Sequence, residues 1–99
     1  MPTSTEPTLR RENDTLVFSG PLLRQDAAAL WPAALRAIAG ARRFDLQAVP
    51  RVDSAGLALL AALAARAGGR VEVSGTPDGL AELRAAYRMT PTLAFADAR

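Results

Sequence analysis

Apolar and polar positions alternate between residues 43 and 48 and then give way to an almost wholly apolar segment. The alternation is typical of a β-strand with one face more buried than the other, and Pro50 interrupts it because proline has no N–H to donate to a sheet. From Leu57 to Ala67 every residue except Arg66 is Leu or Ala. A helix of this composition has no polar face for about three turns, so we expect it to be central and largely covered.

Two strand-length segments precede this region. Residues 9–12 and 15–19 flank Asn13-Asp14, a pair typical of tight turns, and Gly20 follows the second segment. This arrangement predicts an antiparallel β-hairpin at the start of the fold, since turn residues between two short strand-like runs favour antiparallel pairing.

The alanine-rich stretch that opens at Gln25 predicts a helix, but Pro32 lies in its middle. Proline lacks an N–H group and its ring clashes with the preceding turn, so it is poorly tolerated deep inside a helix. Two solutions remain open: a short first turn ends at Trp31 and Pro32 begins the main helix, or one helix kinks at Pro32. We favour the first, with Leu35 and Ile38 facing inward.

The last third of the chain predicts a strand, a helix and a further short strand. Gly68-Gly69 closes the central helix, residues 70–74 alternate as a short strand, and residues 92–95 add an edge strand. Between these strands, Thr76-Pro77 has the residue types that cap and begin a helix. The inward face of that helix repeats at about one-turn spacing at Leu80, Leu83 and Tyr87.

Strands and helices alternate from residue 43 onward, behind a hairpin, which indicates a single α/β domain with a mixed β-sheet and helices packed against it. We expect residues 8–99 to form this domain and residues 1–7 to be a flexible tail. The right-handed crossover rule places the central helix over the sheet, with its N-terminus at the carboxyl edge of a strand. Open α/β sheets favour that edge for binding sites.

The turn before the central helix carries the candidate chemistry. Asp53 and Ser54 are residue types that cap helices, because their side-chain oxygens accept hydrogen bonds from the first N–H groups. Two interpretations stay open at this point. Either the pair only caps the helix, or the Ser54 hydroxyl, at the positive end of the helix dipole, contacts a partner. Gly56 leaves the helix backbone open to close approach by another group.

The composition excludes several classes of site. The 99 residues include no Cys and no His, so no disulfide or thiolate metal site can form, and we expect neither metal nor cofactor. The net charge is only +2, without the basic cluster that nucleic-acid binding requires. Ser54 has no visible base to take its proton, so we expect no enzymatic activity. With neither a bilayer-length apolar run nor a secretory signal, we expect a cytoplasmic protein.

The segment from Val52 to Leu60, VDSAGLALL, resembles the signature of STAS domains. Further positions extend the likeness from Leu9 to Tyr87, and the whole pattern resembles the MlaB-type STAS subunits of Mla phospholipid-transport ABC systems. These positions are Gly20, Leu30-Trp31, Phe44-Asp45-Leu46 and Arg51. Ser54 stands where the MlaB-type subunits carry Thr or Ser.

The resemblance implies a single STAS-like domain that acts as a non-enzymatic accessory subunit. Such a subunit binds and stabilises or regulates the ATPase of an Mla-type ABC transporter, in a complex with the permease, for phospholipid trafficking and outer-membrane lipid asymmetry. It would lie at the cytoplasmic side of the inner membrane, held by the complex, without inserting into the membrane or binding nucleic acid. The contact residues that the resemblance implies are Trp31, Asp53, Ser54, Ala55, Gly56 and Leu57.

The alternative function for a STAS domain is an anti-sigma factor antagonist that binds a serine kinase or anti-sigma factor. These antagonists are phosphorylated at a hydroxyl residue directly before the glycine of the motif, and here this position is Ala55. Because Ala55 has no hydroxyl, the sequence favours the transporter subunit, with Ser54 as a candidate regulatory hydroxyl. The sequence leaves open whether Trp31 lies in the core or at the interface.

Overall fold

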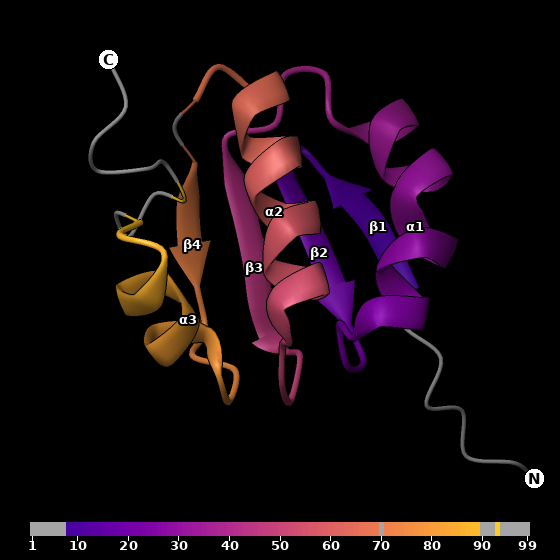
Figure 1. The fold of residues 1–99 in the computed structure, drawn as a ribbon. Helices are drawn as coiled ribbons and strands as arrows, with labels where there is room; N and C mark the ends of the chain where they lie inside the picture. Colours follow the sequence, from indigo (N-terminus) through magenta and orange to yellow (C-terminus); the bar gives the residue numbers. More distant parts are fainter. Residues whose placement is uncertain (1–7, 70, 90–92, 94–99) are drawn as a thin grey trace, which may run out of the picture.

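The computed structural model describes residues 8–69, 71–89 and 93. Figure 1 shows a sheet with helices packed against it, which confirms the predicted α/β class. The elements in chain order are β1 (Thr8–Glu12), β2 (Thr15–Ser19), α1 (Arg24–Ala37), β3 (Arg43–Ala48), α2 (Ser54–Arg66), β4 (Glu72–Ser74) and α3 (Leu80–Ala86).

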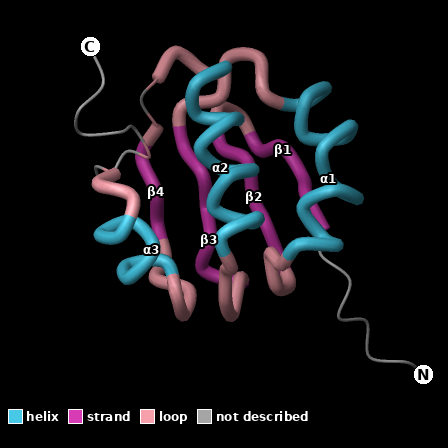
Figure 2. Tube along the Cα trace, in the orientation of Figure 1, coloured by secondary structure: helices cyan, strands magenta, loops and turns pink. Residues whose placement is uncertain are grey.

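The described strands form one mixed sheet in the order β1-β2-β3-β4. β1 and β2 are antiparallel, whereas β2, β3 and β4 run parallel to one another, as the arrows of Figure 1 show. Figure 2 shows the four strands side by side behind the helices. The predicted hairpin and mixed sheet are therefore confirmed. At the edge of the sheet, Arg43 of β3 donates to Glu72 of β4 at 2.9 Å. This hydrogen bond and the charges of Glu72 and Asp14 raise the pKa of the Arg43 guanidinium above its ordinary value.

The helices form a second layer, with α2 at its centre. α2 contacts α1 on one side and α3 on the other, and Figure 1 shows α1 and α2 side by side in front of the sheet. A helix in this position needs an apolar face toward the sheet and apolar flanks toward its neighbours. The Leu- and Ala-rich composition of α2 meets this need, so the prediction of a central helix is confirmed.

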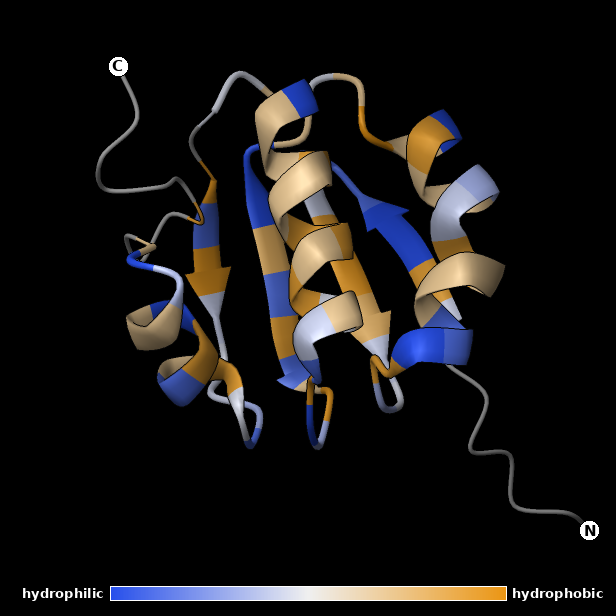
Figure 3. Ribbon diagram, in the orientation of Figure 1, coloured by the Kyte–Doolittle hydropathy of each residue, from blue (hydrophilic) through white to orange (hydrophobic). Residues whose placement is uncertain are grey.

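The core lies between the sheet and the helices. Leu16 and Phe18 of β2 and Phe44 and Leu46 of β3 are fully buried, and Figure 3 shows the hydrophobic residues along these strands. The two phenylalanine rings meet edge to face, with centroids 5.7 Å apart. Ala48, the next residue in the predicted alternation, is exposed, because β3 ends there and its pairing with β2 becomes irregular.

The first helix differs from the solution that the sequence favoured. α1 runs without a break from Arg24 to Ala37, so Pro32 lies inside it and the prediction that Pro32 begins the main helix is wrong. Pro32 has no N–H for the carbonyl of Ala28, but both residues are exposed, so water can replace the missing bond. Leu35 is only half-buried. The buried positions are Leu30, Ala34 and Ile38.

The third helix begins later than predicted. The Asp78 N–H donates to the carbonyl of Pro50, and the Asp78 carbonyl accepts from the Val52 N–H, each at 3.0 Å. These bonds hold the segment after β4 against the loop that precedes α2. The predicted start at Thr76-Pro77 is therefore wrong, and α3 begins at Leu80, because backbone pairing across the fold outweighs a local capping signal.

Two predictions fall on parts of the chain that are not described. The tail predicted at residues 1–7 lies outside the described residues, as does the edge strand predicted at residues 92–95, apart from Leu93. Within the described ranges, no helix combines the length and apolar character needed to cross a membrane.

Candidate functional site

Asp53 is the residue that caps α2. Its Oδ1 accepts a hydrogen bond from the Gly56 N–H at 2.9 Å, in the manner of an N-cap side chain. Its Oδ2 accepts a second bond from the Arg24 N–H at 3.0 Å, at the start of α1. One carboxylate therefore satisfies N–H groups at the beginnings of two helices and holds these beginnings together.

Ser54 is the first residue of α2, and its side chain is not needed for the cap. The residue is exposed, and its hydroxyl makes no hydrogen bond to any described residue. Of the two capping candidates in the sequence, Asp53 does the capping, so the hydroxyl of Ser54 stays available. Ala55, the next residue, is half-buried beside it.

Gly56 faces the interior, and the close approach expected there is made by this chain itself. A Cβ atom at this position would lie 2.1 Å from the carbonyl oxygen of Leu22, much closer than real Cβ atoms come to an oxygen. The same oxygen accepts a hydrogen bond from the Asp53 N–H at 3.2 Å. Gly56 is buried, so in this fold it allows the Leu22 backbone to pass and offers no surface to a partner.

Leu57 also points away from the surface. It is 2% exposed and belongs to the hydrophobic core. The sequence assigned Leu57 to the contact set, yet its position one turn after the cap places it on the inner side of α2. Its remaining surface contributes only to the floor of a hollow beside α2.

Trp31 packs against the core and is also partly exposed to solvent. It also lines a shallow apolar groove between α1 and α2, together with Ala28, Ala55 and Ala58. The guanidinium carbon of Arg66 lies 5.6 Å from the centroid of the Trp31 ring, a distance at which a cation is attracted to the face of an aromatic ring.

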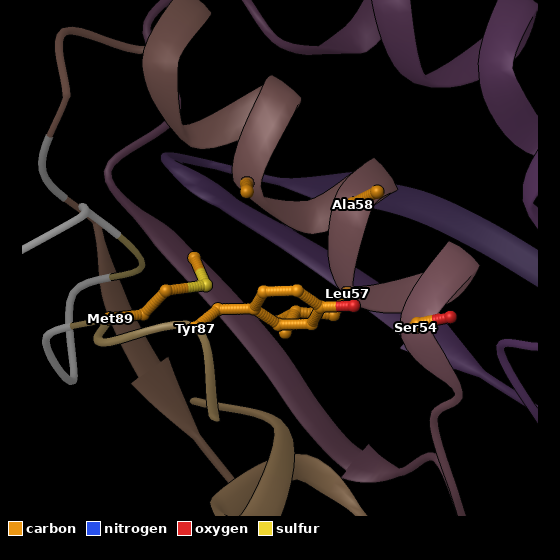
Figure 4. Close-up of a pocket in the computed structure, with 6 residues that line it drawn as sticks. Ser54, Leu57, Ala58, Tyr87 and Met89 are labelled. Atoms are coloured by element: carbon orange, nitrogen blue, oxygen red, sulfur yellow. The ribbon is translucent and has the colours of Figure 1, made fainter. Parts of the chain in front are cut away.

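Tyr87 is a site residue that the sequence did not identify. It is 50% exposed and lines a hollow of about 210 Å³ with Ser54, Ala58 and Met89. Figure 4 shows its ring directed from the end of α3 toward α2. The one-turn spacing with Leu83 placed Tyr87 on the inner face of the helix, but α3 ends at Ala86 and Tyr87 is its C-cap. Because the backbone at Tyr87 is no longer helical, the Tyr87 side chain does not lie on the inner face of α3.

These residues form one continuous surface over the outer side of α2, which we call the α2 face. It is a low ridge of small side chains with an aromatic side chain on each flank, and Figure 3 shows the ridge in the pale colours of alanine. Its members are Trp31, Ser54, Ala55, Ala58, Ala61, Ala62 and Tyr87. The helix is thus less covered than its composition predicted, because α1 and α3 pack against its sides and leave the outer side open.

The chemistry of the α2 face is suited to contact with another surface. The groove beside Trp31 and the hollow beside Met89 are lined mainly by apolar atoms, whereas the hollow beside Arg24 is about half polar. The Asp53 carboxylate accepts hydrogen bonds from two backbone N–H groups. Within the described residues, no group of three or more His, Cys, Asp or Glu side chains is placed to hold a metal ion. A surface of this kind can bury apolar area and form hydrogen bonds through the hydroxyl groups of Ser54 and Tyr87.

Comparisons with known proteins agree on one family. A family described as "Mlab, STAS domain" matches residues 6–93. The chain is similar to the intermembrane phospholipid transport system binding protein MlaB of Escherichia coli strain K12, with 37% identity over 79 residues. The match covers 77% of this chain and 81% of that protein. The protein of the same name from Shigella flexneri matches to the same extent. The family match includes every residue of the α2 face.

Proposed function

The chain belongs to the family of MlaB-type STAS domains, and on this basis we propose that it is an accessory subunit of an Mla-type ABC transporter. In this proposal it has no enzymatic activity of its own. It binds the ATPase subunit and thereby stabilises or regulates the complex that moves phospholipids and maintains outer-membrane lipid asymmetry. The protein lies at the cytoplasmic side of the inner membrane through this complex, without inserting into the bilayer.

The observation that carries the proposal is the open outer side of α2. Ser54 is exposed at one end of an apolar ridge, with Trp31 on one flank and Tyr87 on the other. Interfaces are commonly built from a small apolar centre and a few aromatic residues that contribute most of the binding energy. The face supports docking by a partner protein for this reason.

The small side chains of the ridge favour contact with a helix of the partner. The distance between packed helices depends on the side chains at the contact, so Ala58 and Ala61 allow the two backbones to come close. Ser54 then lies within the covered area, and its hydroxyl must pair with a partner group, because burying it unpaired would cost about 1–3 kcal/mol.

The action of the subunit follows from binding alone. A subunit that binds the assembled or competent state of the ATPase more tightly than its other state shifts the population toward the competent state. The size of the shift is set by the difference in affinity for the two states. Nucleotide and its hydrolysis belong to the ATPase. The role of this chain is to hold the ATPase in the state in which hydrolysis can drive lipid movement.

The first test is co-purification from native membranes and cytoplasm with a tagged Ser54→Glu variant beside the wild type. We expect the wild type to recover an ABC ATPase with its permease, and the variant to recover about tenfold less, because a charged group would be buried in an apolar contact. Ser54 is exposed and does not cap the helix, so we expect its replacement to change the free energy of unfolding by less than about 1 kcal/mol.

The matched control is Ser74→Glu, the same substitution on the other side of the sheet. Ser74 pairs with Asp45, one residue out of step with the buried Phe44, so it lies on the face opposite the helices. This variant should recover the ATPase as the wild type does. Recovery of a serine kinase or an anti-sigma factor in place of the transporter would overturn the proposal. A collapse of stability in Ser54→Glu would show that Ser54 is structural.

A further inference from the structure

We propose that the partner surface that covers the α2 face is acidic, with separate carboxylate groups opposite Arg24 and Arg66. This inference rests on the proposed function and adds the chemistry of the partner. Both arginines are exposed and border the α2 face. Within the described residues, neither forms a salt bridge with a carboxylate.

Arg24 lies at the end of the face where α2 begins. It lines a hollow with Asp53, Ser54 and Tyr87. Arg24 is also the first residue of α1, a position where a cation is disfavoured because the N-terminus of a helix is already the positive end of its dipole. Exposed and unpaired there, its side chain adds positive charge beside the beginnings of two helices.

The nearby carboxylates are used by the backbone. Asp53 accepts N–H groups from Gly56 and Arg24, and Asp26 accepts the N–H of Leu23 at 3.1 Å. Each carboxylate directs its oxygens toward backbone N–H groups at the start of a helix, and neither forms an ion pair with the Arg24 guanidinium. A carboxylate on the partner would be the matching group, since guanidinium and carboxylate pair by charge-assisted hydrogen bonds.

Arg66 lies at the other end of α2 and is held in place by an aromatic ring. Its guanidinium carbon is 5.6 Å from the centroid of the Trp31 ring. A guanidinium over a ring keeps the N–H groups in its own plane, where they can form bidentate bonds to a carboxylate. Because the Arg66 side chain is restrained before binding, less conformational entropy is lost when the pair forms.

The two cations act separately. Twelve helical steps from the start to the end of α2 correspond to about 18 Å along its axis, which exceeds the Debye length of about 8 Å at physiological salt. One acidic group on the partner cannot serve both. The partner therefore presents carboxylates near both ends of an apolar contact.

A protein fits the α2 face better than an anionic membrane does. Helices that lie in a membrane interface insert a row of large apolar side chains such as Leu, Phe or Trp. The large apolar side chains of α2 are buried in the core instead, and its outer ridge consists of alanines, with Trp31 and Tyr87 only on the flanks. Alanine methyl groups reach only a short distance beyond the backbone and suit close contact with a packed surface. The positive charges of Arg24 and Arg66 then favour an acidic patch on a partner protein.

The test measures affinity for the purified ATPase subunit of the Mla-type transporter from the same source. The full chain is compared with Arg24→Glu, Arg66→Glu and the double variant at about 50 mM and about 300 mM NaCl. We expect each reversal to weaken binding by about tenfold at the lower salt and by less at the higher salt, because opposite charges at a rim act through screened attraction. The two effects should multiply in the double variant.

Arg36→Glu is the matched control. Arg36 is exposed in the last turn of α1 and lines none of the hollows along the α2 face. The substitution changes net charge by the same amount, so general electrostatics would affect it equally. We expect its affinity to stay within about twofold of the wild type.

A neutral variant separates failure of this inference from failure of the proposed function. Ala58→Tyr places a bulky uncharged side chain on the ridge and should abolish docking by steric conflict alone. If Ala58→Tyr abolishes binding while both arginine reversals bind like the wild type, the acidic partner surface is overturned and docking stands. If Ala58→Tyr also binds normally, the proposed function fails. Binding to phosphatidylglycerol vesicles that both reversals abolish, with unchanged affinity for the ATPase, would overturn the inference in favour of a membrane.

Discussion

At the scale of single residues, neighbours in the turn before α2 have different tasks. Asp53 has both carboxylate oxygens on backbone N–H groups, whereas the Ser54 hydroxyl is exposed and pairs with nothing in the described part of the chain. Gly56 is buried against the Leu22 carbonyl. A short motif thus combines a cap, an exposed hydroxyl and a point of close backbone packing, and substitutions at these positions should have different consequences.

We expect Gly56→Ala to lower the free energy of unfolding by about 3 kcal/mol, because overpacking a rigid site costs energy and the clashing atom is a backbone oxygen. Helix propensity alone predicts the opposite, a gain of about 1 kcal/mol from glycine to alanine. Equilibrium urea unfolding distinguishes the two. Ala58→Gly on the outer side of the same helix is the control and should cost about 1 kcal/mol. A Gly56→Ala variant more stable than the wild type would contradict the close approach of Leu22.

At the scale of elements, α1 shows how packing outweighs a local signal. Its buried residues Leu30, Ala34 and Ile38 are spaced by four, one turn apart along one stripe. A break at Pro32 would divide this stripe and lose contact with α2 and the sheet. The helix stays continuous because the lost hydrogen bond lies on its exposed side, where water compensates for it.

Pro32→Ala should therefore stabilise the protein by about 2 kcal/mol. Removing proline from a helix interior stabilises the folded state by about 3 kcal/mol. The unfolded chain with alanine has more conformational freedom, which offsets about 0.4–1 kcal/mol of that stabilisation. Thermal and urea unfolding measure the change, and Ala33→Ser on the same turn serves as a near-neutral comparison. A destabilised Pro32→Ala variant would mean that the proline shapes the helix in a way that the fold requires.

At the scale of the whole molecule, the α2 face exists because three helices pack in one layer. Trp31 comes from α1, the ridge comes from α2, and Tyr87 follows α3. Tyr87 is the large hydrophobic residue among those described that is most exposed, at 50%. Its exposed ring lies on the α2 face, where the proposed partner would cover it.

We expect Tyr87→Ala to weaken binding to the ATPase by about tenfold or more, as aromatic residues at interfaces commonly do. The free energy of unfolding should change by less than about 1 kcal/mol, since half of the side chain is already in water. Tyr87→Phe keeps the ring and should bind like the wild type. If Tyr87→Ala binds with normal affinity, Tyr87 does not belong to the docking surface, which then consists of Trp31 and the ridge.

The sequence by itself determined several of the elements and the start of the central helix. The alternation at residues 43–48, the turn at Asn13-Asp14 and the Leu- and Ala-rich run before Ala67 predicted strand, hairpin and central helix correctly, because each depends on neighbouring residues. The junction at Asp53 and Ser54 was located for the same reason, since capping is a local interaction.

Only the tertiary structure decided which side chains reach the surface. Gly56 meets Leu22, and Asp53 bonds the start of α1, through contacts between segments far apart in the chain. Trp31 and Tyr87 come to lie on two sides of α2 only after three helices pack together. Sequence spacing describes the faces of one element, whereas exposure depends on what other elements cover, and this covering is a property of the assembled fold.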